Sequence, residues 1–403
     1  MTSGRMEYGS RDRVWTIPST VWGIMVRSCI QIARRPLMWV GIFLLPLAMF
    51  LFVGSMLDKG LPTRVPAGIV DKDGTNLSRS ITQTLGGMQM VDLVESPNSY
   101  SEARSMLQQG KIYGFFMIPE NFQADLLAGR KPVVTFYTNM AYYVPGTLLF
   151  KTFKATAIYA KAGVAMEVVQ DIGADPQNFA SYLMPVNIQS RGIGNPSLNY
   201  GIYLGNSFIP AILQLMIMLC TAFSLGQEVK YHTSRRLMAM AHGSVTKALF
   251  GKLFPQTVIW WTMAFFMTAW LFRYNHYPMN GEWWIMALSE LLYVVAAQCF
   301  AVTVFGLLPN LRLSLSVCAL TGILTFSIAA YSFPEQSMYP AMSIFSFLMP
   351  ARYNFLIYAN TALNGLPFHY SGIWFACYLA YPLLALLVTG RIKRAFLKPV
   401  YCP

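Results

Sequence analysis

Charged residues are scarce in this 403-residue sequence. They make up 12% of it, about half of the roughly 25% that is usual in soluble proteins. Hydrophobic residues make up 55%, and several apolar runs reach the roughly 20 residues that are needed to cross a bilayer. A soluble globular fold is therefore excluded, and the sequence predicts a polytopic α-helical membrane protein.

The sequence motifs of catalysis and of metal binding are also absent. Gly251-Lys252 is followed by Leu253, so it does not complete a nucleotide-binding loop, and neither HExxH nor GxSxG occurs. None of the six cysteines lies within residues 58–199, and no CxxC or Cys/His spacing suggests a metal site. We expect a chain that is not an enzyme and that binds no cofactor or metal itself.

The net charge of +13 is confined to a few segments. Sixteen of the 30 basic residues but only three of the 17 acids lie in residues 1–36, residues 226–252, Arg312 and the tail from Arg391. Residues 58–199 hold 12 basic and 11 acidic residues. Because short loops rich in Lys and Arg stay in the cytoplasm, these basic segments mark the cytoplasmic face. Anionic membrane lipid is their expected partner, and no motif points to nucleic acid.

Six transmembrane helices are predicted, with both termini in the cytoplasm. They cover residues 37–57, 203–225, 254–272, 283–307, 315–333 and 373–388. The last five form a bundle over residues 201–390, and residues 391–403 form a cytoplasmic tail. Prolines break residues 334–370 into pieces too short to span, so we expect a re-entrant or interfacial hairpin on the outer side.

Residues 1–36 are predicted to form a cytoplasmic N-terminus that contains an amphipathic helix. Ser19 or Thr20 would cap it. Its apolar face, which we expect to lie in the membrane interface, holds Trp22, Met25, Val26, Cys29 and Ile30.

Residues 58–200 alternate between strand-like and helix-like patterns. Residues 65–70, 90–94, 113–118 and 132–137 are strand-like, and a long helix is expected from residue 143 to about 172. This alternation predicts an extracytoplasmic α/β domain with a small mixed sheet, inserted between the first and second spans.

The loop at residues 226–252 is the only sizeable basic loop between two spans. Residues 234–241 place Leu237, Met238, Met240 and Ala241 on one side, after Arg235 and Arg236. That pattern is typical of a short amphipathic helix along the membrane surface, although an ordinary basic loop is an alternative.

Glu290 is the one carboxylate well inside a predicted span. Such a residue is a candidate proton or cation site. Alternatively, it hydrates near the outer interface or pairs with Arg273 or a polar neighbour.

Apolar faces on the second and fifth spans are a candidate translocation path, with core packing as the alternative. The residues concerned are Phe208, Leu213, Met216, Ile217, Leu320 and Leu324.

Several segments resemble one family in their order and spacing. They are AGIVDKD at residues 67–73, GFFMIPENF at 114–122, Asn199-Tyr200 leading to Phe208-Ile209-Pro210, SFP at 332–334, and Met349-Pro350 with Tyr353. Glu228, Thr233 and Gly251-Lys252-Leu253 fall where that family has an "E…GT…GK" coupling element. The chain resembles the ATP-binding-cassette exporter permeases of the type-2 class, in the multidrug- and lipid-export-like subgroup that has a large extracytoplasmic domain. It departs from the pattern at His232, where glycine is usual, and at Arg235, where an acid is common.

The resemblance implies a permease subunit of the bacterial inner membrane that exports a small amphiphilic, drug-like or lipid-like substrate. Separate ATPase subunits would carry ATP and magnesium, and a second permease subunit, identical or paralogous, would complete the transporter. A periplasmic adaptor and an outer-membrane channel are further expected partners. The coupling residues would be Glu228, Thr233, Ser234, Arg235, Arg236 and Leu237. The alternatives are an ion-coupled carrier and a membrane-anchored receptor or scaffold.

Overall fold

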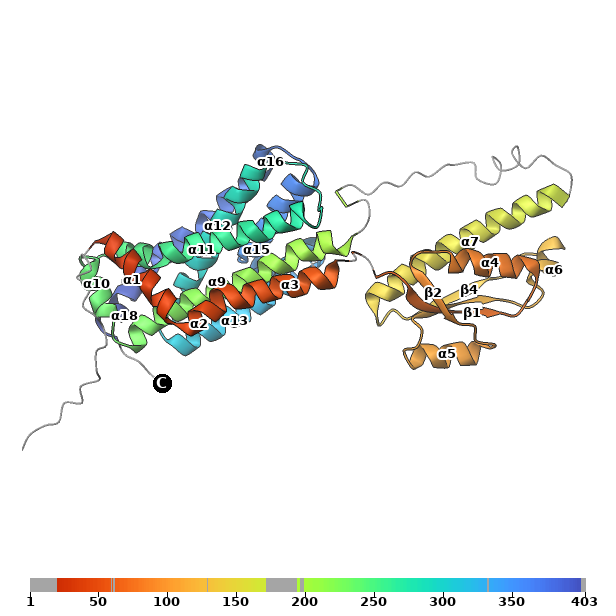
Figure 1. Ribbon diagram of the computed structural model, residues 1–403, viewed down its shortest axis with the longest axis horizontal. Helices are drawn as coiled ribbons and strands as arrows, with labels where there is room; N and C mark the ends of the chain where they lie inside the picture. Colours follow the sequence, from red (N-terminus) through yellow and green to blue (C-terminus); the bar gives the residue numbers. More distant parts are fainter. Residues whose placement is uncertain are drawn as a thin grey trace, which may run out of the picture. The chain divides into compact units, whose positions relative to one another are not determined.

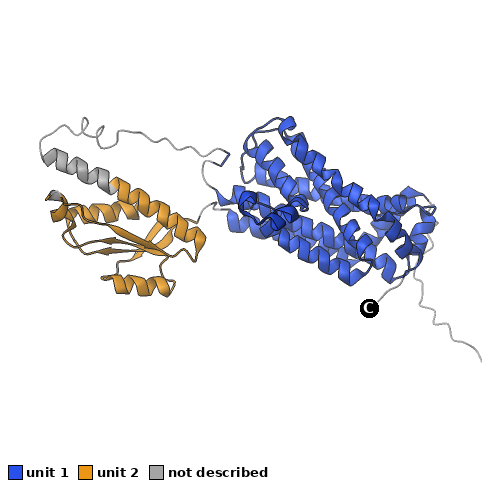
Figure 2. Ribbon diagram, turned by 180° about the vertical axis from the view of Figure 1, so that it is seen from behind, with its two compact units in different colours: residues 1–60, 192–403 blue, residues 61–191 orange. Residues whose placement is uncertain are grey.

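The computed structural model describes residues 20–58, 60, 62–128, 130–171, 194–195, 199–331 and 333–399. Contacts divide the chain into two compact units, which are coloured separately in Figure 2. Unit 1 comprises Met1–Gly60 and Gly192–Pro403, and unit 2 comprises Leu61–Arg191. The predictions for residues 1–19, for residues 172–193 and for the end of the tail at residues 400–403 lie outside the described residues.

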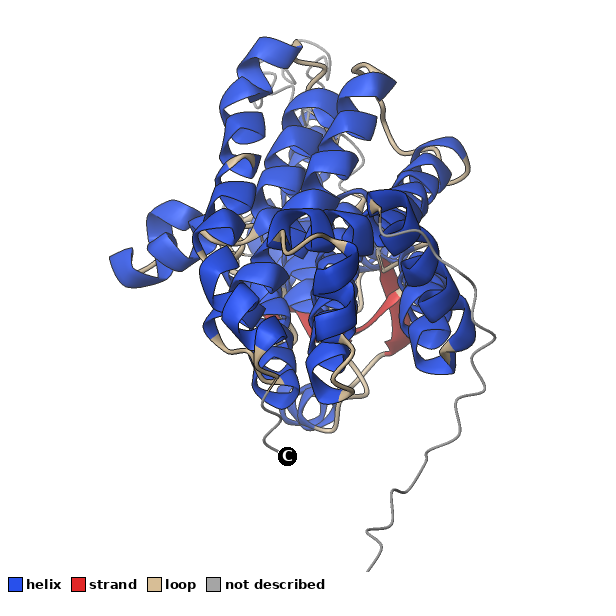
Figure 3. Cartoon of the chain, turned by 90° about the vertical axis from the view of Figure 1, so that its left-hand side faces the viewer, coloured by secondary structure: helices blue, strands red, loops and turns tan. Residues whose placement is uncertain are grey.

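Unit 2 contains a four-stranded mixed sheet. The strands are β1 (Val65–Asp71), β2 (Val91–Glu95), β3 (Gly114–Ile118) and β4 (Thr135–Thr138), in the order β2-β1-β3-β4. The β2-β1 and β1-β3 pairs are parallel, whereas β3 and β4 run antiparallel with Phe115 opposite Tyr137. In the described part of the chain, strands occur only in this unit (Figure 3).

Helices cover both faces of this sheet (Figure 1). They are α4 (Asn76–Gly86), α5 (Tyr100–Gln108), α6 (Phe122–Leu127) and α7 (Tyr143–Asp171). Successive side chains of a strand point to opposite faces, so Phe116 packs against α4 and α7 while its neighbour Phe115 packs against α5. Ser99 caps α5 by accepting a hydrogen bond from the Glu102 N–H.

Unit 1 is a helical bundle, and among its described residues five helical segments are long and apolar enough to cross a membrane. They are Pro36–Leu57, Gly201–Lys230, Trp283–Leu307, Leu311–Ile328 and Phe368–Leu387. The first joins α2 (Pro36–Trp39), η1 (Val40–Leu44) and α3 (Leu45–Leu57), and the second joins η2 (Gly201–Gly205) and α9 (Asn206–Lys230). The third is α12 (Trp283–Leu307), the fourth is α13 (Leu311–Ile328), and the last joins α16 (Phe368–Tyr378) and α17 (Ala380–Leu387).

The sixth predicted span, residues 254–272, lies within α11 (Val245–Arg273). This helix has 29 residues and is long enough to cross. It is not among the five apolar segments of the described chain. Its sequence includes Lys247, Lys252, Gln256 and four threonines, which dilute its apolar residues.

The core of unit 1 is built around α9 and α12. Buried residues of α9 pack with those of α11, α12 and α15 (Pro350–Tyr358), and α13 lies along α9. Two glycines allow the close approach of α9 and α13. A methyl group at Gly322 would come within 2.4 Å of Leu215, and one at Gly226 within 2.5 Å of Leu311.

The N-terminal helix α1 (Val21–Arg34) begins where the sequence predicts, and Thr20 caps it by accepting a hydrogen bond from the Gly23 N–H. A second face of the helix, which the sequence analysis did not single out, packs against protein. Ile24, Ser28 and Ile32 are buried and the helix packs against α11, whereas Trp22 is 69% exposed. The predicted apolar face is therefore the outward one.

Residues 334–370 form a helical hairpin, but its two arms differ. The first arm, α14 (Pro340–Phe347), is apolar and mostly exposed, while α15 is buried between α9, α12 and α16. Buried Arg352 joins the arms through an ion pair to Glu335 and a 2.7 Å hydrogen bond to Ser346 Oγ. The hydrogen bond from Arg352 lowers the pKa of the Glu335 carboxyl.

Candidate functional site

The carboxylate of Glu228 is the centre of a buried polar cluster at one end of unit 1. We call Arg27, Gln31, Glu228, Thr233 and Lys252 the Glu228 cluster. Lys252 Nζ lies 2.7 Å from Oε1, and Arg27 Nη2 lies 2.8 Å from Oε2. Gln31 Nε2 donates to Oε1 at 3.2 Å, and Thr233 Oγ1 donates to Oε2 at 2.5 Å. Glu228 and Lys252 are each only 2% exposed.

The cluster joins three helices and a turn. Arg27 and Gln31 come from α1, Glu228 from the last turn of α9, and Lys252 from α11. Two cations offset the one buried carboxylate, and hydrogen bonds occupy both of its oxygens, which is the condition for a buried charge to be tolerated. Ser28 Oγ also donates to the Lys252 carbonyl at 2.6 Å, which fixes α1 against α11.

The helix α10 (Ser234–Met240) follows this cluster directly. The sequence predicts that its apolar residues Leu237, Met238 and Met240, together with Ala241, lie on one side of the helix. These residues are buried, and the atoms that cover them belong to other helices of unit 1. They pack against Ile24 of α1, Leu225 and Val229 of α9, Phe305 of α12, and Ile392 and Phe396 of α18 (Thr389–Leu397). Figure 1 shows α1, α10 and α18 together at one end of unit 1.

Polar residues of α10 bind the C-terminal helix. Ser234 Oγ donates to the Phe396 carbonyl at 2.8 Å, and Arg235 Nε donates to the Leu397 carbonyl at 3.1 Å. Arg236 is exposed, whereas the next residue, Leu237, is buried. The structure therefore places five of the six predicted coupling residues in contacts within unit 1 and leaves Arg236 on the surface.

The turn between α9 and α10 explains one departure from the family pattern. His232 has a φ of 55°, in the left-handed region that glycine adopts without strain. Any residue other than glycine is disfavoured there by roughly 1–2 kcal/mol. Glycine is usual at this position because it adopts this left-handed backbone conformation without strain. The imidazole of His232 is exposed.

The predicted translocation path is not assembled into one cavity. Leu213 and Ile217 are buried in the core, and Met216 is partly buried against it. Leu320 and Leu324 are 59% and 40% exposed on the face of α13 that points away from Gly322 and its contact with α9. Phe208 packs edge-to-face on Phe326.

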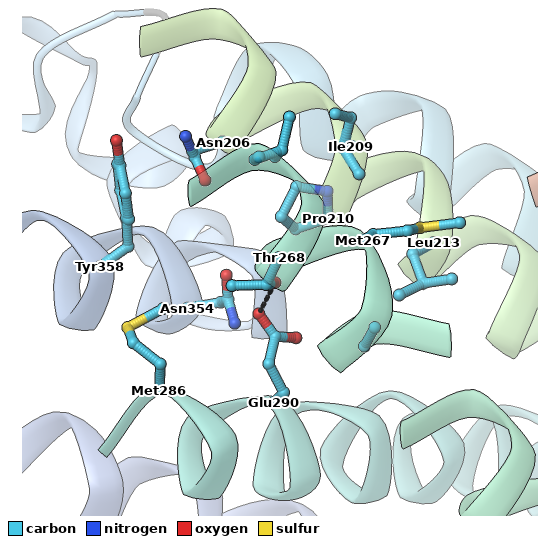
Figure 4. A pocket seen from close by; sticks show the side chains of 12 residues that line it. Asn206, Ile209, Pro210, Leu213, Met267, Thr268, Met286, Glu290, Asn354 and Tyr358 are labelled. Atoms are coloured by element: carbon cyan, nitrogen blue, oxygen red, sulfur yellow. Dashed lines mark hydrogen bonds between the residues drawn. The ribbon is translucent and has the colours of Figure 1, made fainter. Parts of the chain in front are cut away.

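Glu290 lies in α12 beside a small cavity (Figure 4). It is 3% exposed, and its Oε1 accepts a hydrogen bond from Thr268 Oγ1 at 3.0 Å. The prediction of a polar neighbour is thus confirmed, while hydration at the interface and a pair with Arg273 are not, since Arg273 is exposed at the end of α11. The cavity lining includes Leu213 from the predicted path, Asn206 and Asn354.

Sequence reasoning did not identify Arg27, Gln31 and the α18 carbonyls as partners of the coupling element. Arg27 and Glu228 are 201 positions apart, and helical periodicity does not report such distant pairs. One signal was available: Lys252 and Glu228 are the charged residues that stand nearest to the predicted spans around this loop.

The fold and this site together define a polytopic membrane protein in which a buried ionic cluster connects a short surface helix to the membrane helices. Comparison with known families agrees with this class. Residues 36–391 match the ABC-2 family transporter proteins. The chain belongs to that family.

A curated relative is similar over a smaller part. The linearmycin resistance permease protein LnrN of Bacillus subtilis (strain 168) is 33% identical to this chain over 105 residues. The match covers 26% of this chain and 27% of that protein, so it spans about a quarter of the relative's length.

Proposed function

We propose that this chain is the membrane-spanning permease subunit of an ATP-driven exporter. It moves a small amphiphilic, drug-like or lipid-like substrate out of the cytoplasm or the inner leaflet of a bacterial inner membrane. Separate ATPase subunits supply the energy, and a second permease subunit, identical or paralogous, completes the path. Membership of the ABC-2 family supports a transport role over a catalytic one. The name of the relative LnrN is consistent with export of a toxic compound.

The observation that carries the proposal is the Glu228 cluster. A subunit without its own nucleotide site needs a surface element whose displacement moves the membrane helices. The cluster joins α1, α9 and α11 through ion pairs to Glu228, and Thr233, just before α10, donates a hydrogen bond to the same buried carboxylate. Packed elements of this kind move as a unit and not by local bending. A push on α10 is therefore transmitted to three helices.

The proposed topology has six spans, with α11 as the additional one, and both termini in the cytoplasm. The positive charges of Lys230, Arg236 and Lys247 near α10 support a cytoplasmic position for this end of unit 1. The first span and α9 flank unit 2 in the sequence, so unit 2 is extracytoplasmic in this topology. It is the natural docking place for a periplasmic adaptor that leads to an outer-membrane channel.

The test compares two charge reversals on arginines that are both exposed. Arg236→Glu changes the surface of α10, and Arg273→Glu makes the same change at the other end of α11 from Lys252. We expect a P-loop ATPase to co-purify with the wild type and with Arg273→Glu. Its amount is expected to fall at least roughly fivefold with Arg236→Glu, because a charge reversal in an interface introduces repulsion as well as removing a contact.

Equal amounts of the ATPase with both variants would show that α10 is not the docking surface. Absence of any P-loop ATPase from the wild type, purified at native expression level, would contradict the energy source. The ion-coupled carrier or the receptor would then be the better description.

A further inference from the structure

The C-terminal helix α18 has a basic outward side. Ile392 and Phe396 are buried in the same apolar cluster as residues of α9, α10 and α12. Arg394 lies two positions from each of them, which is about 200° around a helix, and it is exposed, as are Lys393 and Lys398. We call Lys393, Arg394 and Lys398 the α18 cations. Within the described part of the chain, none of them forms an ion pair.

The helices α18 and α10 are fixed to each other and lie at the same end of unit 1 (Figure 1). Ser234 Oγ and Arg235 Nε donate to the last two carbonyls of α18, which a helix end otherwise leaves without a partner. At its start α18 is close to α12, since a methyl group at Gly306 would come within 2.6 Å of Val388. A force on α18 therefore reaches α10 and α12 together.

The helix α10 alone offers a partner little surface. Of its seven residues only Arg235, Arg236 and Ala239 are exposed, whereas a stable protein interface takes about 20–30 residues from each side. A docking surface at α10 must therefore include neighbouring elements. The helix α18 adds the α18 cations and Leu397, which is 45% exposed. An apolar side chain with charges around it is the usual make-up of an interface core and its rim.

The charge at this end of unit 1 indicates the chemistry of the partner. The described segments that the proposed topology places in the cytoplasm are residues 20–36, 226–252, 308–312 and 389–399. Their one acid, Glu228, is buried. The described surface of these segments thus carries basic side chains and no exposed carboxylate. Interfaces pair surfaces of opposite potential, so the complementary partner is acidic.

A protein partner fits this surface better than lipid does. A helix that lies on a membrane exposes an apolar side to the lipid. The helix α1 does so, with Trp22 69% and Val26 36% exposed. The apolar sides of α10 and α18 are instead buried in unit 1, and Leu397 is the one large apolar side chain exposed on the two helices.

We infer that α18 forms the ATPase docking surface together with α10, and that the α18 cations bind acidic residues of the ATPase subunit. This inference rests on the proposed function, because it adds a second contact with the same partner. Since α18 follows α17 directly and packs on α12, the docked ATPase subunit also acts on the last span. The Glu228 cluster conveys its movement to α1, α9 and α11, and α18 conveys it to α12 and α17.

The test is co-purification of the ATPase with two charge reversals of the full chain. Arg394→Glu changes the α18 cations, and Arg312→Glu makes the same change at an exposed arginine of α13, a helix that packs on α9 and α12. The amount of ATPase is expected to fall at least roughly fivefold with Arg394→Glu, because an interface charge becomes repulsive. Arg312→Glu and the charge-conserving Arg394→Lys should retain it. Gel filtration verifies that each variant is folded.

A second arm uses the unaltered chain. Carbodiimide joins a lysine amine directly to a carboxylate that touches it, and mass spectrometry locates the linked residues. We expect Lys393 and Lys398 to link to aspartates or glutamates of the ATPase. Lys151 and Lys154 are the controls, because they are exposed on α7 of unit 2, and they should form no such link.

Undiminished ATPase with Arg394→Glu, or an equal loss with Arg312→Glu, would overturn the inference. So would a loss of co-purified anionic phospholipid from Arg394→Glu while the ATPase remains, since the α18 cations would then bind the membrane. In each of these cases the ATPase still co-purifies with the wild type, and the proposed function stands. A wild type without any ATPase contradicts both the inference and the proposed function.

Discussion

A single side chain, Glu228, balances two cations on other helices. Arg27 and Lys252 both approach it within 3 Å, and Lys252 is as deeply buried as the carboxylate. The net charge of the Glu228 cluster is therefore +1 with the acid and +2 without it. The stability of this end of unit 1 depends on the acid more than on either base.

Replacing Glu228 with Gln is expected to lower the free energy of unfolding by about 3–5 kcal/mol, because it leaves two buried cations without a counter-charge. Adding Lys252→Met to that variant should restore part of the loss, since only Arg27, which is less deeply buried, then remains. Thermal and denaturant unfolding in detergent measure both effects. Glu282→Gln serves as the exposed control. A Glu228→Gln protein that melts with the wild type would refute this account.

At the scale of elements, the contact between α9 and α13 depends on two small residues. Gly226 and Gly322 let the helices approach until Leu311 and Leu215 occupy the space of a β-carbon. Close packing across small residues is the main attraction between helices in a bilayer, where burial of apolar surface gives little.

Replacing Gly322 with Ala is expected to force α13 away from α9 and to cost about 1–3 kcal/mol. Gly372 in α16 has nothing within 4 Å of the position of an added methyl group. Gly372→Ala is therefore the control, and it is expected to be neutral or slightly stabilising. The melting temperatures of the two variants, measured in the same detergent, test this expected difference in stability. Equal values would mean that the helices can move apart without cost.

At the scale of the whole molecule, the two units have separate cores. The clusters around Phe116 and Phe115 in unit 2 share no residue with those of unit 1. Its described residues form a complete sheet with helices on both faces. A domain of this size can bury enough apolar surface to fold alone.

We therefore expect residues 61–191, produced separately, to unfold cooperatively. Phe116→Ala should reduce the stability of that fragment by about 3–5 kcal/mol, because Phe116 is fully buried between the sheet and α7. Val133→Ala, at a residue that is 73% exposed, should change it by less than about 0.5 kcal/mol. Circular dichroism during urea titration gives both values. A gradual transition in the wild-type fragment would contradict an independent fold.

Much of the fold was predictable because its signals are local. The strands β1 and β3 follow from short apolar runs, and Thr20 caps α1 as its sequence context predicts. The buried position of α15 was not predictable: its nine residues are too short to span, and only the neighbouring helices decide that it is enclosed.

The sequence indicated where along the chain the candidate site lies, but not which side chains contact one another there. The basic loop and the apolar side of α10 were visible in the sequence, whereas the partner of each side chain was not. Periodicity identified an apolar face on α1 but did not show that α1 packs against α11 through its other face. Likewise, Arg273 was one partner that the sequence suggested for Glu290, whereas in the structure Thr268 donates a hydrogen bond to this carboxylate.

The position of α1 in the Glu228 cluster has a consequence for the order of synthesis. Arg27 leaves the ribosome 201 residues before Glu228, an interval of roughly 10–40 s at usual bacterial and eukaryotic elongation rates. During that time the helix has no protein partner, and its exposed apolar side with Trp22 can rest in the lipid surface. The nascent chain thus holds Arg27 without its acidic partner until α9 arrives, and assembly of this end of the molecule waits for its last-made contacts, those of α18.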